Sequence, residues 1–374
     1  MNEVLIRNVV FWTAVVLSMI CVAFPPFRYL FFSVPFLVLF ATLGDGSVRL
    51  GDEAKPFLAF VAAGVLMAPI ATGEGLKDLL LTFAGVSVSL LCEAPTLRAK
   101  KLFLFSLMSA AIYFPIFGDL HDLTFNLLKS QSPFESNFGF VFGAVALIAM
   151  LEQRKRLALT CLVLSVVCLK RIAVLGLLAC FVMWLAGEEN GRKILNPIVM
   201  LCINCALLGA MLLYGAGYFD FAVHELTGQS ANEFGQGRQA LLSLPANAFF
   251  RHPEQFFLFG AGPGATYELA NKGVMQYVGK ANLHSDLIKI FYEYGFVFYC
   301  IFIGLMYSAK KYATRIAFLF MNVLFITDNT LIYYFLLLVF VVGVRSVNQQ
   351  DEKNSNSKPG LATQRQTPAM GSVQ

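Results

Sequence analysis

Long apolar runs repeat along almost the whole chain, and they constrain the fold more than any other feature. They recur from Val9 to Val344 and are mostly roughly 14 to 22 residues long, close to the ~20 residues that a helix needs to cross a bilayer. Because unpaired backbone groups are costly in lipid, such runs are expected to be α-helices. Of the 374 residues, 57% are hydrophobic and 14% charged, which is more apolar surface than one soluble core can bury. The sequence therefore predicts an all-α polytopic membrane protein.

Twelve runs are read as spans, and the shortness of several leaves a range of ten to twelve. The first run is followed by Pro25-Pro26-Phe27-Arg28 and not by a small-residue cleavage site, so we expect it to be a retained helix. The runs are Val9–Phe24, Tyr29–Leu43, Phe57–Ala71, Leu79–Cys92, Leu102–Phe117, Phe138–Leu151, Leu157–Leu169, Ile172–Ala186, Leu195–Tyr214, Ser285–Ser308, Ile316–Thr327 and Leu331–Val344.

Positive residues set the expected orientation. With both chain ends in the cytoplasm, the short outer loops hold only Arg28, Lys77, Lys129, Lys170 and Arg171. The cytoplasmic side then holds Arg7, Arg49, Lys55, Arg98, Lys100, Lys101, Arg154, Lys155, Arg156, Arg192, Lys193, Lys310, Lys311, Arg315 and Arg345. This asymmetry puts the one long polar interruption, residues 215–283, outside.

The chain is thus expected to consist of nine spans in 1–214, a large outer loop in 215–283, three spans in 284–347 and a tail in 348–374. The tail is rich in Gln, Ser, Asn and Lys, which predicts a disordered cytoplasmic segment. All eight cysteines fall within or at the ends of apolar runs, so no disulfide framework is expected. The Cys202-x-x-Cys205 pair lacks His or acidic neighbours and is interpreted as packing. Metal-ligand spacing and Walker or dinucleotide motifs are absent, so we expect no catalytic metal, no cofactor and no ATP-driven pump.

Lys170-Arg171 is the positive pair that breaks the orientation rule. It stands between two short apolar runs, in a turn expected at or just below the bilayer surface, where charge is costly and usually functional. One alternative is that both side chains reach to lipid phosphates. Another is a single helix over 157–186, which would send Lys310, Lys311 and Arg315 outside against the rule.

In the outer loop, Arg238 follows Gly237 at the start of an expected helix that Arg251-His252-Pro253 ends. Arginine matches phosphate oxygens with a planar fork of donors, so Arg171 and Arg238 together are candidates to hold a pyrophosphate. The alternative for Arg238 is an ion pair with Glu233 or Glu254. Arg251 is interpreted as structural or substrate-binding rather than catalytic, and His252 has the alternative role of capping the helix.

Two further motifs complete the candidate site. Gly260-Ala261-Gly262-Pro263-Gly264 permits close backbone approach to a ligand, although a tight turn needs the same residues. His284 stands ahead of a helix that Ser285 or Asn282 could cap, where it could donate to a phosphate or accept a proton from a sugar hydroxyl. Asp286, Lys289 and Glu293 share one face of that helix, as a binding stripe or as a structural network.

The order of these motifs resembles the bacterial O-antigen polymerase and ligase family. The resemblance rests on Lys170-Arg171-Ile-Ala-Val-Leu-Gly176, Gly237-Arg238, His252-Pro253, Phe259-Gly260-Ala-Gly262, Leu283-His284-Ser-Asp286-Leu and Glu293-Tyr-Gly295 around one long outer loop. It departs from the common pattern at Ser285, where Asn often follows the His, and at Phe296-Val-Phe after Gly295. The first departure bears on the role of His284 and the second on packing.

The resemblance implies a glycosyltransferase of the C type in the bacterial inner membrane, acting at the periplasmic face without a metal. Its donor and acceptor would be glycans linked to undecaprenyl pyrophosphate, within membrane lipid, with a chain-length regulator protein as a possible partner and no nucleic acid. Arg171 and Arg238 would stabilise the leaving pyrophosphate, with Lys170, Arg251, His252, Gly262, Asp286 and Glu293 binding substrate. His284 would act as the base, oriented by Asp286.

Polymerase and ligase differ in the acceptor, which is a second lipid-linked repeat unit for one and a lipid A core or a protein for the other. The compact loop favours a polymerase. A lipid-linked sugar transporter would be expected to show paired repeats and charges near mid-span, and a non-catalytic anchor would not need Arg171, Arg238 and His284.

Overall fold

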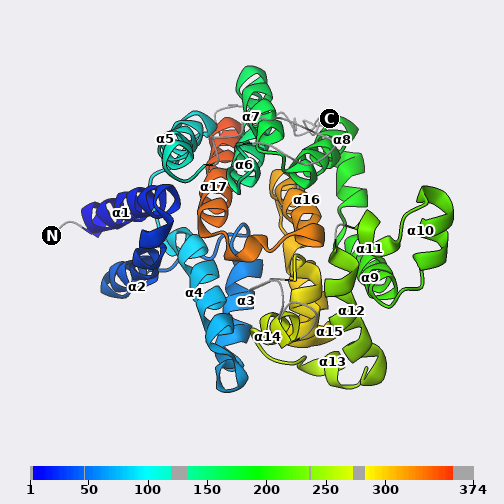
Figure 1. Cartoon of the computed structure of the whole chain (residues 1–374). Helices are drawn as coiled ribbons and strands as arrows, with labels where there is room; N and C mark the ends of the chain where they lie inside the picture. The colour runs from blue at the N-terminus through cyan, green and yellow to red at the C-terminus, as the bar shows by residue number, and fades with distance from the viewer. Residues whose placement is uncertain (1–2, 46, 119–132, 236, 273–282, 357–374) are drawn as a thin grey trace, which may run out of the picture.

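A computed structural model describes residues 3–45, 47–118, 133–235, 237–272 and 283–356. Across these residues the chain is helical and contains no strand (Figure 1). The first half consists of α1 (Glu3–Ala23), η1 (Pro25–Phe32), α2 (Ser33–Asp45), α3 (Lys55–Leu66), η2 (Ala68–Ile70), α4 (Gly73–Ser87), η3 (Val88–Leu90), α5 (Ala99–Phe117), α6 (Phe138–Leu151), α7 (Lys155–Val167), α8 (Arg171–Ile194) and α9 (Pro197–Gly215). The second half consists of α10 (Asp220–Thr227), α11 (Ala231–Phe234), α12 (Arg238–Arg251), α13 (Gln255–Leu258), α14 (Ala265–Lys272), α15 (Asp286–Tyr307), α16 (Tyr312–Thr327), η5 (Thr330–Ile332) and α17 (Tyr334–Asn356).

Each of the twelve apolar runs contains a helix, as the pattern predicts. Six helical segments among the described residues are long and apolar enough to cross a membrane, namely Val4–Ala23, Pro25–Gly44, Ala99–Phe117, Arg171–Ile194, Pro197–Gly215 and Asp286–Tyr307. The chain is therefore an all-α membrane protein. The count of twelve full spans is not reached, because α3, α6 and α16 are apolar but only 12, 14 and 16 residues long.

Two of the short helices, α6 and α16, lie in the interior, where neighbouring helices bury most of their residues. The packed centre of the molecule is formed by α6, α16 and α17 (Figure 1), and nearly all side chains of α6 are buried. In contrast, α5 and α8 expose large apolar side chains such as Ile116, Leu178 and Leu185 along their outer faces. A helix enclosed by neighbours need not match the bilayer thickness by itself, which explains how apolar runs below ~20 residues fit this fold.

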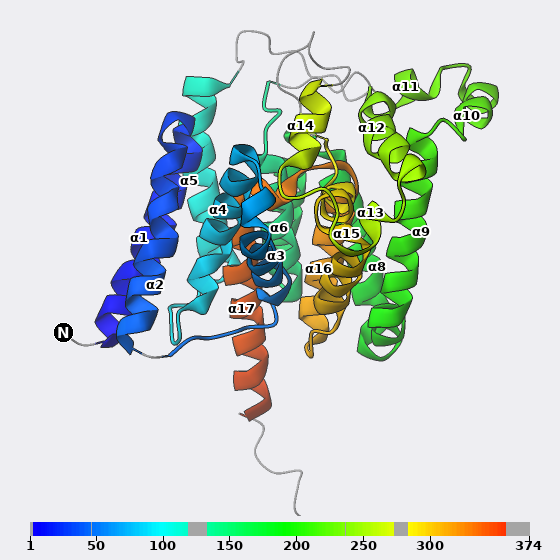
Figure 2. The same ribbon diagram turned by 90° about the horizontal axis from the view of Figure 1, so that it is seen from below.

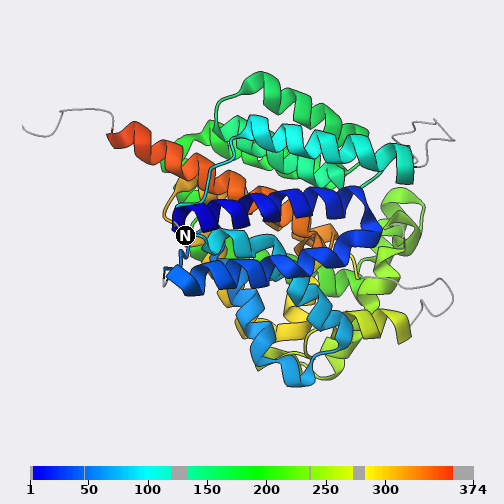
Figure 3. The same cartoon turned by 90° about the vertical axis from the view of Figure 1, so that its left-hand side faces the viewer.

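The two ends of the bundle differ in charge and in structure. The start of α1 and the end of α17 lie at the end opposite to the loop helices α10 to α12 and α14 (Figures 2 and 3). At the first end, Arg7 bonds Ser47 and the Arg345 guanidinium donates to the Leu91 carbonyl. Arg28, Lys77, Lys170 and Arg238 lie at the loop end. These six residues therefore divide between the two ends of the bundle in the way that the sequence predicts, and Lys129 lies outside the described residues.

Two boundaries differ from the sequence reading. Residues 348–356 are helical, because α17 continues to Asn356, where Thr314 bonds the Asn348 side chain and Lys311 pairs with Glu352. Residues 357–374 lie outside the described residues. The helix α8 also runs past Ala186 to Ile194, with a break at Gly187, whose φ is 76°.

Candidate functional site

The Lys170-Arg171 pair stands at a sharp break between α7 and α8, which are two separate helices. Leu169 has φ 53°, a left-handed conformation that is uncommon for a leucine. The half-buried Lys170 caps α8, with its Nζ 3.8 Å from the Glu135 carboxylate and 5.4 Å from the centre of the Phe140 ring. Its stem crosses Gly139, where an added Cβ would lie 2.6 Å from Lys170 Cγ. The turn therefore fixes one cation at the loop end of the bundle.

Arg171 is exposed at the first position of α8. Arg238 is likewise exposed at the first position of α12, after Gly237, whose φ of 82° lets the chain turn. The next residue, Gln239, donates to the Tyr214 carbonyl and to the Asp220 carboxylate, which ties the start of α12 to α9 and α10. Among the described residues the Arg238 guanidinium has neither a hydrogen bond nor an ion pair, so the expected alternative of a pair with Glu233 or Glu254 is not formed.

His284 precedes α15 on a strained backbone. Its φ is 55°, while the following Ser285 is extended and caps α15 by accepting from the Ile288 amide at 3.3 Å. Ser285 is thus the cap, and the alternative cap Asn282 lies outside the described residues. The His284 side chain is exposed, whereas Leu283 and Ser285 on either side are buried. A non-glycine residue held in this conformation by buried neighbours is a frequent feature of functional sites.

Charges from three separate segments influence the His284 imidazole. Although His284 remains in contact with solvent, the protein around it removes part of its hydration and so lowers its pKa, and the positive charges of Arg238 and Lys170 lower the pKa further. The Asp328 carboxylate acts in the opposite direction and raises this pKa. Three of the sequence candidates, from turns far apart in the chain, are therefore within electrostatic reach of one another. The net effect is a lowered pKa, which favours the neutral form of this imidazole.

Asp328 and Tyr333 belong to this cluster, and the sequence reading assigned them no role. The Tyr333 hydroxyl donates to Asp328 Oδ1 at 3.0 Å, and the Asn329 amide donates to the same oxygen at 3.0 Å. The Asp286 amide donates to the Asp328 carbonyl at 3.2 Å, which joins the break after α16 to the start of α15. Asn137 also hydrogen-bonds Tyr333. The sequence did contain a signal for Asp328, because an acidic residue between two short apolar runs is in a costly place for a charge.

Asp286, Lys289 and Glu293 lie on one face of α15, as their spacing predicts, and all three are buried. Lys289 Nζ lies 2.5 Å from Asp78 Oδ2 on α4. Glu293 accepts hydrogen bonds from the amide and hydroxyl of Thr266. Asp286 Oδ2 accepts from Thr330 and from the Leu331 amide, whereas its Oδ1 is buried without a partner in the described residues. These groups form a network that joins α4, α14, α15 and η5 inside the bundle.

The glycine-rich segment closes against α15, in a contact that we call the glycine latch, formed by Gly260 to Gly264. At Gly295 (φ 84°) α15 breaks its helical geometry. The Ala261 amide then donates to the Tyr292 carbonyl at 2.8 Å and the Gly262 amide to the Glu293 carbonyl at 2.9 Å. Added Cβ atoms would meet the opposing backbone at 2.6 Å from Gly260 and 2.7 Å from Gly295. Gly262 is buried in this contact, and its amide hydrogen is donated to the Glu293 carbonyl and not left open to a ligand.

Arg251 and His252 lie at the other end of α12 from Arg238. Both are exposed, and His252 ends the helix with its Nδ1 3.5 Å from the Glu254 carboxylate. Neither contributes to the electrostatic surroundings of His284. Within the described ranges, no group of three or more His, Cys, Asp or Glu side chains is arranged to hold a metal ion.

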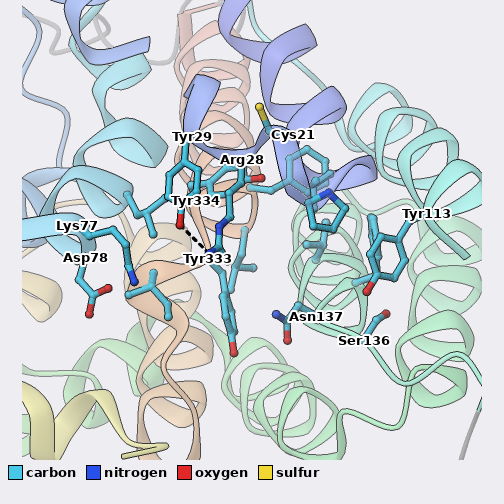
Figure 4. Close-up of a pocket in the computed structure, with 18 of the residues that line it drawn as sticks. Cys21, Arg28, Tyr29, Lys77, Asp78, Tyr113, Ser136, Asn137, Tyr333 and Tyr334 are labelled. Carbon is cyan, nitrogen blue, oxygen red and sulfur yellow. Dashed lines mark hydrogen bonds between the residues drawn. The ribbon is translucent and has the colours of Figure 1, made fainter. Parts of the chain in front are cut away.

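A cavity of about 490 Å³ adjoins the cluster at the loop end of the bundle (Figure 4). Its wall includes Asn137 and Tyr333, which also belong to the His284 cluster. Other wall residues come from α1, η1, α4, α5 and α14. A concave site of this size, with mixed apolar and polar walls, suits a small organic ligand.

No protein family, curated protein or solved structure matches this chain. The class that fold and composition define is an all-α membrane protein with a charged and partly strained cluster at one end of its bundle.

Proposed function

We propose that this chain is a metal-independent glycosyltransferase that polymerises oligosaccharide repeat units carried on undecaprenyl pyrophosphate. It would act at the periplasmic face of a bacterial inner membrane, on a fold of the glycosyltransferase C type. The observation that carries the proposal is the exposed His284, held in a left-handed backbone conformation with Lys170, Arg238 and Asp328 within electrostatic reach. Cations can compensate the negative charge of a leaving pyrophosphate, and a neutral imidazole can accept the proton of an attacking hydroxyl.

The leaving group explains the cations. When the bond between the anomeric carbon and the pyrophosphate oxygen breaks, its electron pair remains on the pyrophosphate, whose negative charge grows. Arg238 has no carboxylate partner among the described residues, so its five donors are free to meet those oxygens. Lys170 adds a second positive charge, and Arg171 lies next to it at the start of α8. The cluster would thus stabilise the transition state more than the ground state.

The acceptor explains the histidine and the aspartate. The attacking sugar hydroxyl forms the new bond to the anomeric carbon and passes its proton to His284. Asp328 favours the imidazolium that results, which is the sense in which it raises the pKa of His284. Tyr333 and Asn329 hold the Asp328 carboxylate in place. A single displacement of this kind inverts the anomeric configuration and releases undecaprenyl pyrophosphate.

The test compares glycan chain lengths in cells that lack the chain and in cells that regain it as wild type, Arg238→Ala or Arg238→Lys. Arg192→Ala is the matched control, because it removes a half-buried arginine whose side chain, among the described residues, bonds Glu188 on its own helix. We expect Arg238→Ala to insert normally and yield one capped repeat without long chains. Arg238→Lys should recover little, because an ammonium cannot make the bidentate contact.

The pattern of the deletion separates the candidate acceptors. A single repeat that remains attached to the lipid core indicates a polymerase. Loss of all glycan from the core, with lipid-linked polymer accumulating, would indicate a ligase. Full chain extension by Arg238→Ala at normal abundance would contradict the proposed site.

A further inference from the structure

The cavity next to the His284 cluster has an unusual lining. Figure 4 shows Tyr29, Tyr333 and Tyr334 near the middle of the view, with Lys77 and Asp78 on one side and Tyr113 on the other. The wall also contains apolar side chains from α1, α4, α6 and α17 and further polar ones, such as Glu74 and Asn137. Five tyrosines line it, from η1, α5, α14, the residue before α17, and α17 itself, and they are Tyr29, Tyr113, Tyr267, Tyr333 and Tyr334.

The charges of the wall argue against a pyrophosphate in this cavity. Lys77 is paired with Glu74, and Asp78 is paired with Lys289 behind the wall. Arg28 bonds the Tyr29 hydroxyl at 2.8 Å and is the wall's one cation without a carboxylate partner among the described residues. With Lys77 and Asp78 both paired, Arg28 leaves the wall a single uncompensated positive charge, which is little for a polyanion such as pyrophosphate. The cationic group of Lys170 and Arg238 lies in the His284 cluster instead.

The same wall argues against a lipid chain. Glu74, Lys77 and Asp78 all present polar atoms to the cavity, and hydrocarbon in contact with them would remove their hydration without replacing it. A ligand that combines hydroxyl groups with apolar faces can interact with both the polar and the apolar side chains of the lining. Sugars have this character, since their C–H faces pack on aromatic rings while their hydroxyls bond to carboxylates and amides.

From these observations we infer that the cavity is a saccharide-binding subsite, which holds sugar residues of the glycan next to His284. This inference rests on the proposed function and adds to it a place and a chemistry for the sugar. Tyr333 links the two sites, because it lines the cavity while its hydroxyl donates to Asp328. Sugar rings in the cavity would present a hydroxyl toward the aspartate and histidine, and pyrophosphate would lie over the cations.

The test uses the full-length protein in lipid nanodiscs and two probes. The first probe is the repeat-unit oligosaccharide, freed from its lipid by mild acid, and the second is inorganic pyrophosphate. Tyr267→Ala is the main variant, because Tyr267 makes no aromatic contact with the described residues and its loss should not disturb packing. Tyr113→Leu is the second variant, since Tyr113 packs on Phe114, Phe117 and Phe138 and leucine retains most of its volume. Tyr218→Ala, on an exposed tyrosine outside the cavity, is the control.

We expect each cavity variant to weaken oligosaccharide binding about tenfold, equivalent to ~1.4 kcal/mol, while pyrophosphate affinity is unchanged. Tyr218→Ala should leave both affinities at the wild-type value. Unchanged oligosaccharide affinity in both cavity variants would overturn the inference. A phospholipid that co-purifies with the wild type and is lost in Tyr267→Ala would overturn it too.

The proposed function fails separately from the inference. If the wild-type protein does not extend a lipid-linked repeat, the polymerase proposal falls. Tyrosine-dependent binding of the free oligosaccharide would then still establish the saccharide site.

Discussion

The glycine latch allows a matched test of close backbone approach. Gly260 (φ 62°) and Gly228 (φ 69°) have nearly the same left-handed conformation. An alanine at either position therefore carries the same backbone strain, about 1–2 kcal/mol. The surroundings differ, because a Cβ at Gly228 meets nothing within 4 Å, whereas one at Gly260 would lie 2.6 Å from the Tyr292 carbonyl oxygen. The difference between the two alanine variants isolates the contact with α15.

The geometry sets the size of that difference. Carbon contacts normally relax to about 3.5 Å or more, so the latch must withdraw by on the order of 1 Å. This movement stretches the bonds from the Ala261 and Gly262 amides to the Tyr292 and Glu293 carbonyls. Each bond contributes about 0.5–1.5 kcal/mol, so Gly260→Ala should lose about 1–3 kcal/mol more than Gly228→Ala.

Buried thiols provide the assay. Cys161 and Cys180 are free and buried, so a thiol-reactive dye reports thermal unfolding of the purified protein in detergent. We expect the unfolding midpoint to fall clearly in Gly260→Ala and slightly in Gly228→Ala. Equal midpoints in the two variants would refute the view that the latch depends on close approach to α15.

Two further predictions concern charged groups. Lys289→Met leaves the buried Asp78 and Glu293 without their cation and should lower the free energy of unfolding by about 3–5 kcal/mol. The double variant Lys289→Met with Asp78→Asn should recover part of this loss. The same dye measures both unfolding midpoints, and equal midpoints in the single and double variants would contradict the ion pair. If His284 is the base, activity should be lost only as pH falls below about 6.5, because its pKa is lowered and the neutral form persists to lower pH. Removing a nearby cation with Lys170→Met should raise that pKa and move the acid limb of the pH–rate profile upward; an unmoved limb would exclude His284 as the titrating group.

Local pattern was sufficient to find the helices, because each apolar run carries its own helix signal. Pattern did not show that α6 and α16 would be enclosed by protein, so the apolar runs alone do not separate helices long enough to cross a membrane from shorter interior ones. For the site, helix spacing put Asp286, Lys289 and Glu293 on one face, and the broken orientation rule singled out Lys170.

Partners distant in the chain could not be read in the same way. Lys289 is 211 residues from Asp78, and no local signal connects them. Asp328 joins the cluster only because the break after α16 folds against the start of α15. Its neighbours Asn329 and Thr330 marked a polar break in the sequence, but not which segment would meet it.

The ion pair between α4 and α15 also bears on how the protein is made. The ribosome delivers α4 long before α15, so Asp78 is in place while its lysine has yet to be synthesised. Asp78 lies in the first turns of α4, at the loop end, where its carboxylate can stay hydrated until Lys289 is synthesised. Lys289 and Glu293 cannot remain hydrated in this way, because both lie deeper in a helix that lipid would surround if the rest of the bundle were absent. Insertion of α15 is therefore favourable only against a nearly finished bundle, which makes closure around this helix one of the last events of biosynthesis.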